Sequence, residues 1–180
     1  MKRHSGRLTI ALLALAGAAA CSTGGGAVHA ADTGTPSATG GDRTWLAALH
    51  QANLAEIQAG ELAKKKGTTP AIRSVGAMIV TDHVASDDQV ARVAKSLKIT
   101  LPSSAAPADA AAASRLANES GGTFDHDFVS TMMTGHQKMI SKTQTEIAQG
   151  AEPQVKNLAQ STLPVLRKHL TALRKAAPTG

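Results

Sequence analysis

Apolar residues recur at intervals of three and four along four long stretches, a pattern typical of helices that bury one face. The stretches cover residues 43–66, 70–98, 123–149 and 153–176. Gly67 and Gly150 follow the first and third stretches, while Pro70 and Pro153 open the second and fourth. Glycine after a helix and proline in its first turn are common boundary residues. The pattern predicts four long helices, the first ending in a left-handed cap at Gly67.

The connections between these stretches differ in length, and this difference indicates how the helices are joined. Two short turns predict antiparallel hairpins of the first with the second helix and of the third with the fourth. The middle connection is longer and contains an alanine-rich segment, residues 107–119, that favours a short helix. We therefore expect an all-α fold, a ferritin-like four-helix bundle with a crossover between its two hairpins. A simple up-and-down bundle is the alternative, because the extra segment can fold back on itself.

The first 30 residues have the features of a signal peptide. Three basic residues within positions 1–7 precede an apolar run at 8–20, which is too short to span a bilayer. Cleavage before Cys21 would create a lipid anchor on that cysteine, whereas cleavage after Ala30 would release the chain. Both alternatives place the mature protein outside the cytoplasm, and an uncleaved membrane anchor is a third interpretation. Residues 31–42 are rich in Thr, Gly, Ser and Pro and predict a flexible tether before a helical domain at 43–177.

Composition and charge narrow the classes of partner. Aromatic residues make up 2% of the chain, which disfavours a base-stacking surface. The net charge of +6 falls to +3 without residues 1–30, so we expect no nucleic-acid partner. We find no phosphate-binding loop, no Cys-x-x-Cys and no nucleophile motif, which disfavours an enzyme. If the protein is an enzyme, we expect metal-dependent redox chemistry. Any protein partner is unknown.

Each predicted helix carries one potential metal ligand near the middle of its apolar stripe: Glu56, His83, His136 and His169. Counted from the turns, all four lie at a similar depth if the hairpins align. Burying them apart from one another would cost several kcal/mol, whereas together they could bind a cation. If a metal binds there, Asp82 and Asp125 could accept hydrogen bonds that orient the imidazole rings.

The identity of the metal stays open between iron, copper, zinc and manganese. Three methionines near His136 favour copper, although such residues commonly fill cores; they are Met132, Met133 and Met139. The absence of a Glu-x-x-His pair disfavours a carboxylate-bridged di-iron centre. The alternative to a metal site is a buried network in which the three histidines bond to Glu56, Asp82, Asp125 or Thr162. The protein would then be a non-catalytic structural or interaction protein of the cell envelope. His50 is predicted to be solvated, and His126 lies outside the stripe.

The residues that carry this pattern also resemble a known family. They are Asn53-Leu54-Ala55-Glu56, Met78, Thr81-Asp82-His83, Leu101-Pro102, Gly121, Phe124-Asp125, His136, Thr162-Leu163-Pro164 and His169. Together they are similar to the bacterial secreted domain-of-unknown-function family 4142 of the ferritin-like superfamily. The resemblance spans about residues 43–173 and implies an exported or lipid-anchored four-helix bundle with no established activity. It marks the same glutamate and three histidines as candidate metal ligands. Phe128 stands where the family often has tyrosine.

Overall fold

In the computed structural model, residues 37–178 are described, and within them the chain is all-helical, as predicted. The helices are α1 (Gly40–Lys66), α2 (Pro70–Ser96), α3 (Pro107–Asn118), α4 (Gly121–Gln149) and α5 (Pro153–Ala176). The predicted signal peptide, the cysteine that could carry a lipid and residues 31–36 of the predicted tether lie outside the described residues. None of the helices between residues 37 and 178 combines the length and apolar character needed to cross a membrane.

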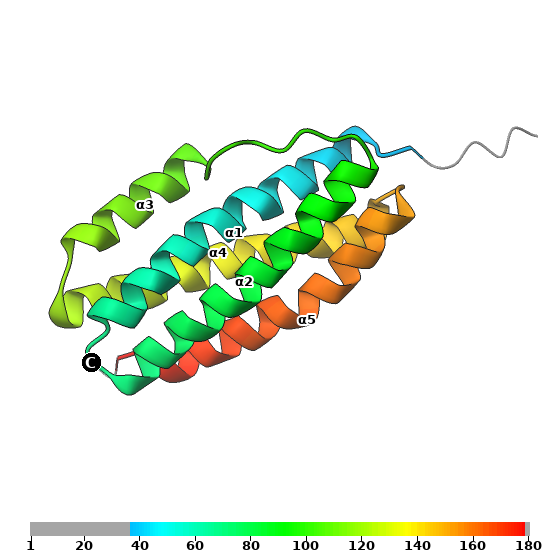
Figure 1. The fold of residues 1–180 in the computed structure, drawn as a ribbon. Coiled ribbons are helices and arrows are strands. Elements are labelled where there is room, and N and C mark those ends of the chain that lie inside the picture. Colours follow the sequence, from blue (N-terminus) through cyan, green and yellow to red (C-terminus); the bar gives the residue numbers. More distant parts are fainter. Residues whose placement is uncertain (1–36, 179–180) are drawn as a thin grey trace, which may run out of the picture. The chain divides into compact units, whose positions relative to one another are not determined.

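The four long helices pack side by side, each against two others (Figure 1). Helix α1 contacts α2 and α4, and α5 contacts the same two helices from the opposite side. Helix α3 lies outside this group, on α1 and α4.

Contacts at the two ends of α4 fix its direction. At its start, Asp125 accepts a hydrogen bond from the Thr68 backbone N–H (3.1 Å), just after α1 ends. Beyond its end, the Ala151 N–H donates to Asp42 Oδ1 (3.1 Å) in the first turn of α1. Helix α4 is therefore antiparallel to α1, and the connection containing α3 carries the chain back along the length of the other helices.

The first helix starts three residues earlier than the sequence pattern indicates. Thr39 accepts from the Asp42 backbone N–H (3.2 Å), and the Asp42 carboxylate accepts from the Thr39 N–H (2.6 Å). This reciprocal capping box, reinforced by the contact of Asp42 with residue 151, begins the helix at Gly40. The prediction that the tether continues to residue 42 is therefore wrong.

Two other helix ends correct details of the prediction. Helix α2 ends at Ser96 rather than residue 98, because Lys98 takes a left-handed conformation with φ of 55°. Gly67 does not form a left-handed cap, since its φ is −54°. Glycine is needed there for space: a Cβ would lie 2.7 Å from the Ala63 carbonyl oxygen and 2.7 Å from Ile72.

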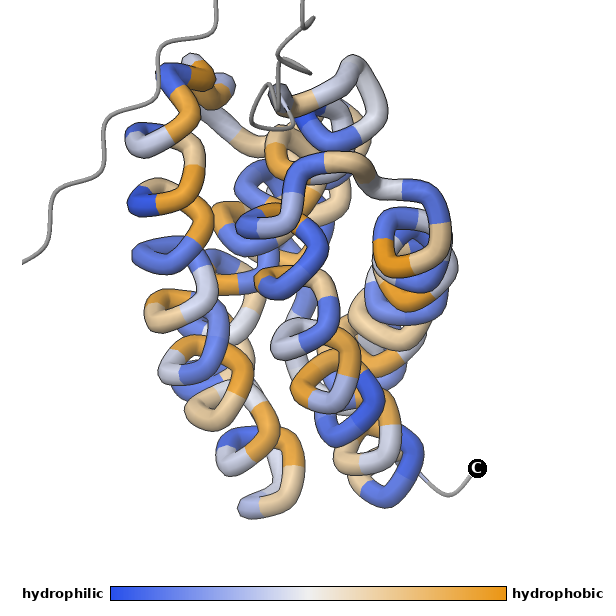
Figure 2. The backbone as a smooth tube through the Cα atoms, turned by 90° about the vertical axis from the view of Figure 1, so that its right-hand side faces the viewer, coloured by the Kyte–Doolittle hydropathy of each residue, from blue (hydrophilic) through white to orange (hydrophobic). Residues whose placement is uncertain are grey.

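The interior contains two apolar clusters separated by a polar layer. One cluster packs around Phe124, Phe128 and Ile79, and the other around Trp45, Leu49 and Leu166. Figure 2 shows how hydrophobic and hydrophilic positions alternate along each helix. On every long helix, the predicted ligand lies in sequence between the members of one cluster and the members of the other. The fold thus brings four polar side chains to one level of a largely apolar core.

Candidate metal centre

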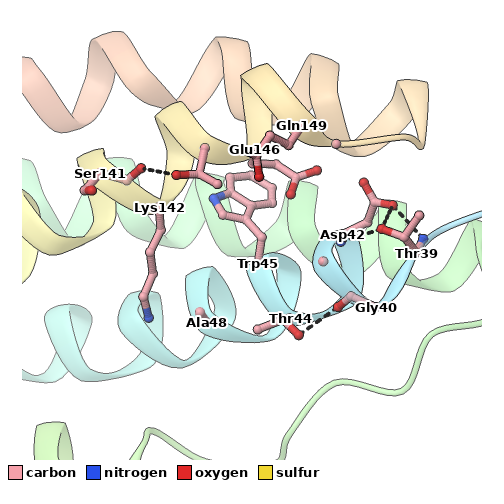
Figure 3. A pocket seen from close by; sticks show the side chains of 13 residues that line it. Thr39, Gly40, Asp42, Thr44, Trp45, Ala48, Ser141, Lys142, Glu146 and Gln149 are labelled. Carbon is pink, nitrogen blue, oxygen red and sulfur yellow. Dashed lines mark hydrogen bonds between the residues drawn. The ribbon is translucent and has the colours of Figure 1, made fainter.

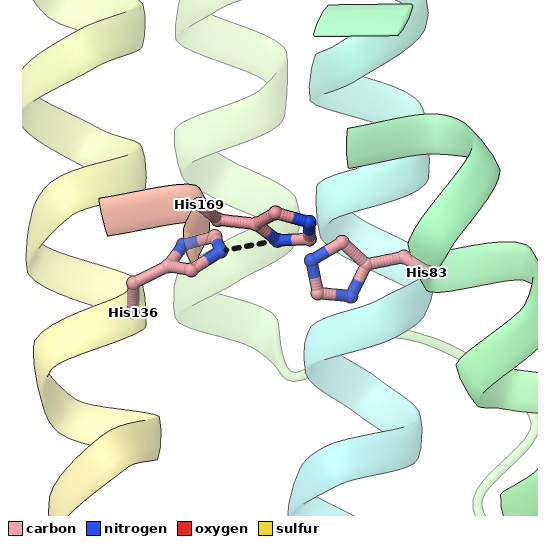
Figure 4. Close-up of side chains that lie close together, drawn as sticks. All are labelled: His83, His136 and His169. Carbon is pink, nitrogen blue, oxygen red and sulfur yellow. Dashed lines mark hydrogen bonds between the residues drawn. The ribbon is translucent and has the colours of Figure 1, made fainter. Parts of the chain in front are cut away.

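One side chain from each long helix contributes to the polar layer, and all four side chains meet. The glutamate from α1 and the histidines from α2, α4 and α5 are at most 5% exposed. Glu56 Oε2 lies 2.8 Å from His83 Nε2 and 3.5 Å from His136 Nε2. His136 Nε2 lies 3.1 Å from His169 Nδ1 (Figure 4). One nitrogen from each ring lies within 4.8 Å of the others, a spacing that could hold one metal ion.

Each imidazole is oriented by an acceptor on its outer side. The Nδ1 of His83 bonds Asn53 Oδ1 (2.8 Å), and the Nδ1 of His136 bonds its own helix at the Met132 carbonyl (2.9 Å). These acceptors, a carbonyl and an amide oxygen, require N–H on the facing ring nitrogen.

The third ring has a carboxylate as its outer partner. His169 Nε2 bonds Asp82 Oδ2 at 2.9 Å, and Asp82 also accepts a hydrogen bond from Lys168 Nζ at 2.9 Å. In a neutral imidazole, protonation of one nitrogen leaves a lone pair on the other. The rings therefore direct the lone pairs of His83 Nε2, His136 Nε2 and His169 Nδ1 toward the interior.

This arrangement places acceptors against acceptors. His136 Nε2 and His169 Nδ1 face each other at 3.1 Å, and both carry lone pairs when the rings are neutral. Glu56 Oε2 and His83 Nε2 are buried and, among the described residues, have no hydrogen-bond partner despite their 2.8 Å separation. Buried polar atoms without partners are costly, so the cluster requires either an added proton or a cation.

Burial disfavours the added proton on two of the rings. It lowers the pKa of His136, against the attraction of Glu56. It also lowers the pKa of His169 to about 4, although the hydrogen bond to Asp82 opposes the change. For Glu56, burial acts to raise the pKa, but the adjacent histidines outweigh it and hold the pKa below its ordinary value. The rings of His136 and His169 thus present nitrogen lone pairs beside the Glu56 carboxylate, and transition metals bind both kinds of ligand.

The two aspartates predicted to orient imidazoles have different roles. Asp82 lies against His169, in the position expected for it. Asp125 lies elsewhere: both of its carboxylate oxygens accept hydrogen bonds from Thr68, in the turn between α1 and α2. It precedes His136 by 11 residues, about 16 Å along the helix axis. The prediction that Asp125 orients an imidazole is therefore wrong.

Sequence reasoning missed the acceptors of the other two rings. Asn53 is fully buried and lies three residues before Glu56 on the same stripe. Its position could have indicated a role in the site, because an amide on an apolar stripe needs a buried hydrogen-bond partner. The Met132 carbonyl could not be identified from residue types, because it is a backbone group.

His50 is not solvated as predicted. Its ring contacts Asp87 Oδ1 (2.7 Å) and the carbonyl oxygen of Pro102 (3.0 Å), in the chain that follows α2. Met132, Met133 and Met139 pack with the two apolar clusters.

A separate feature lies at the start of α1, where a cavity of about 460 Å³ is lined by Asp42, Trp45 and Glu146 (Figure 3). Burial and the contact with Asp42 raise the pKa of Glu146 to about 7 from its ordinary value of 4.5. The folded chain therefore retains this proton over a pH range in which the unfolded chain has lost it. Its contribution to stability is complete below pH 4.5 and is lost as the pH rises through 7.

Comparison with known proteins identifies the family. The model of the family described as Domain of unknown function (DUF4142) matches residues 27–176. The chain belongs to this family. No curated protein sequence matches the chain.

Two solved structures have a similar fold. A DUF305 fragment from Deinococcus radiodurans has a TM-score of 0.69 and 16% sequence identity, with 78% of this chain and 97% of the fragment covered. The structure described as "CopM in the Cu(I)-bound form" has a TM-score of 0.62 and 17% identity, with 74% of this chain and 93% of CopM covered. At these identities, the similarity shows a shared helical fold.

Proposed function

We propose that this protein is a ferritin-like four-helix bundle that binds one transition-metal ion between Glu56, His83, His136 and His169. The observation that carries the proposal is the convergence of three imidazole lone pairs and a carboxylate at one buried point, with no proton donor directed into it by the described residues. A cation at this point would satisfy all four groups together. Asn53 and Asp82 would hold their rings in the orientation that a metal requires.

Copper is the first metal to test. With all three imidazoles neutral, one proton on each ring, the carboxylate of Glu56 would give the inner site a charge of about −1. A Cu⁺ ion would neutralise this charge, which lowers the cost of burial. The similarity to a Cu(I)-bound structure supports the same choice. Bound copper or iron would supply one-electron redox chemistry, whereas zinc would not.

The proposed role is metal handling or protection against metal stress, outside the cytoplasm. The predicted signal peptide at residues 1–30 and the alternative lipid anchor at Cys21 support this location. The core position of the site supports storage or buffering of an ion more than conversion of an organic substrate, because the ligands are at most 5% exposed.

A hydrogen-bond network without metal is the competing interpretation, favoured by the fact that all three rings already have outer partners. The two interpretations differ in what lies between the four side chains. The hydrogen-bond network requires an added proton there, whereas the metal site requires a metal cation.

Elemental analysis and thermal melts of the purified, untagged chain test the proposal. Copper, zinc, iron and manganese are each added after treatment with a chelator. A metal that binds only the folded state stabilises it by about 2.7 kcal/mol when the free metal concentration is 100 times Kd, so the melting temperature should rise. His83→Ala should abolish the rise and the retention of metal, whereas the matched control His126→Ala, on an exposed ring, should retain both. No retention and no shift with any metal would favour the network instead.

A further inference from the structure

The ligands are buried, so a metal ion needs a route through the protein to reach them. His136 and His169 are fully buried, and His83 and Glu56 are 3% and 5% exposed. Two cavities reach the edge of the polar layer, from opposite sides of the fold. One is lined by His83 and Asp82, between α2 and α5, and the other by Glu56, among α1, α3 and α4.

Size distinguishes the two routes. The cavity between α2 and α5 has a volume of about 240 Å³, against about 40 Å³ for the cavity beside Glu56. The cavity between α2 and α5 thus has about six times as much space for water as the cavity beside Glu56 (240 against 40 Å³). An ion that sheds its hydration shell gradually needs space for the departing waters. Helix α3 also covers the smaller cavity, which includes Ala113 and Leu116 in its wall.

The side chains between α2 and α5 explain the opening. Small residues face each other there, namely Ala85 and Ser86 on α2 and Ser161 and Thr162 on α5, so the two helices leave space between them. Three of these residues carry hydroxyl groups, which make this wall of the groove polar.

A carboxylate links this groove to the centre. The Asp82 side chain is 27% exposed, lines the groove and contacts His169 Nε2 at 2.9 Å. An ion pair with Lys168, which also lines the groove, holds the carboxylate in place (2.9 Å). His83 lines the same groove and has its unpartnered Nε2 at the buried centre.

We propose that the groove between α2 and α5 is the route by which the metal ion enters and leaves the site, past Ser86, Ser161 and Asp82 to His83. This inference rests on the proposed metal-binding function and adds how the ion reaches its ligands. Because binding and release follow one route, a substitution that narrows the groove slows both and leaves the affinity unchanged.

The test uses full-length protein loaded with Cu⁺ and then mixed with an excess of a chromophoric Cu⁺ chelator that is too bulky for the groove. Colour develops as copper leaves the protein. Ala85→Phe and Ser161→Phe place a ring at the exposed rim of the groove, from α2 and α5 respectively, without replacing a residue that contacts a histidine. Each should slow copper release at least fivefold, with Kd unchanged within twofold. The matched control Ala112→Phe, at the smaller cavity, should release copper at the native rate.

Native release rates in both groove variants would overturn the route, as would slow release confined to Ala112→Phe. Native protein that retains no copper at equilibrium would contradict copper binding itself, and the route with it. If the protein retains copper but the groove substitutions do not change the release rate, the metal site is supported and only the proposed route is refuted. A groove variant that melts well below the native chain is replaced by Val165→Phe, which narrows the same groove from a half-buried position.

Discussion

Replacing Asn53 with alanine tests whether the orientation of His83 matters for metal binding. The amide oxygen of Asn53 accepts the hydrogen bond from His83 Nδ1 at 2.8 Å, and this contact leaves Nε2 as the inward lone pair. Alanine removes the acceptor, so the ring can rotate or change tautomer. Loss of such an orienting partner typically weakens metal affinity 10–100-fold, or about 1.4–2.7 kcal/mol.

The same substitution should also destabilise the metal-free chain. It leaves the buried Nδ1–H of His83 without an acceptor, at a cost of about 1–3 kcal/mol. For a domain of this size, each kcal/mol lowers the melting temperature by about 4 °C. Cu⁺ affinity is measured by competition with a chromophoric chelator, and stability by thermal melting followed by circular dichroism.

The control is Asn118→Ala, in which an exposed asparagine loses a hydrogen bond to Ser114 at the end of α3. It should leave Cu⁺ affinity unchanged. Native affinity in Asn53→Ala would refute the reasoning, because it would show that the metal does not depend on the ring orientation that Asn53 imposes. A lower melting temperature with native affinity would restrict Asn53 to a structural role.

Three further substitutions test other parts of the structure. Gly76→Ala should lower the melting temperature by several degrees, because its Cβ would lie 2.8 Å from the Gly60 carbonyl oxygen where α1 and α2 meet, and overpacking costs about 1–3 kcal/mol; Gly122→Ala, where a Cβ meets nothing within 4 Å, should not destabilise the chain. Asp125→Ala should lower the melting temperature, because Thr68 loses its hydrogen-bond acceptor, and should leave the Cu⁺ affinity at the native value. A reduced Cu⁺ affinity would show that Asp125 does contribute to the metal site. Glu146→Gln mimics the protonated acid at every pH. Between pH 4.5 and 7 the native chain loses the stability that the proton on Glu146 provides, so the melting temperature of the variant minus that of the native chain should increase over this range. A difference that does not change with pH would contradict the raised pKa of Glu146.

The helices were predictable because helical periodicity is local. Apolar spacing and the prolines at positions 70, 107 and 153 are properties of neighbouring residues, and three of the helices begin at these prolines. The start of α1 was missed although Thr39 and Asp42 have capping-box spacing, because the glycines between them indicate a tether. Contacts with residues 151 and 152, more than 100 positions away, help to hold that helix end, and local patterning carries no information about them.

The candidate ligands were identifiable for a related reason. Glu56, His83, His136 and His169 each interrupt an apolar stripe, and a polar side chain in such a position needs a partner inside the core. Counting residues from the turns placed them at one level. The role of Asp125 was wrong because membership of a stripe identifies a face of the helix but not the neighbour that faces it, which here is the turn at Thr68.

The sequence by itself determined that the chain is helical, which face of each helix is buried and which four candidate ligands interrupt the buried faces, since these follow from composition and short-range periodicity. Only the tertiary structure decided which ring nitrogens face the centre. For His83 and His169, that choice depends on acceptors from other helices: Asn53 lies 30 residues from His83, and Asp82 lies 87 residues from His169. An imidazole can present either nitrogen, and a hydrogen bond on its outer side selects which one carries the lone pair. The groove between α2 and α5 is likewise a property of the packed helices, because small residues leave a channel only where two helices bring them face to face.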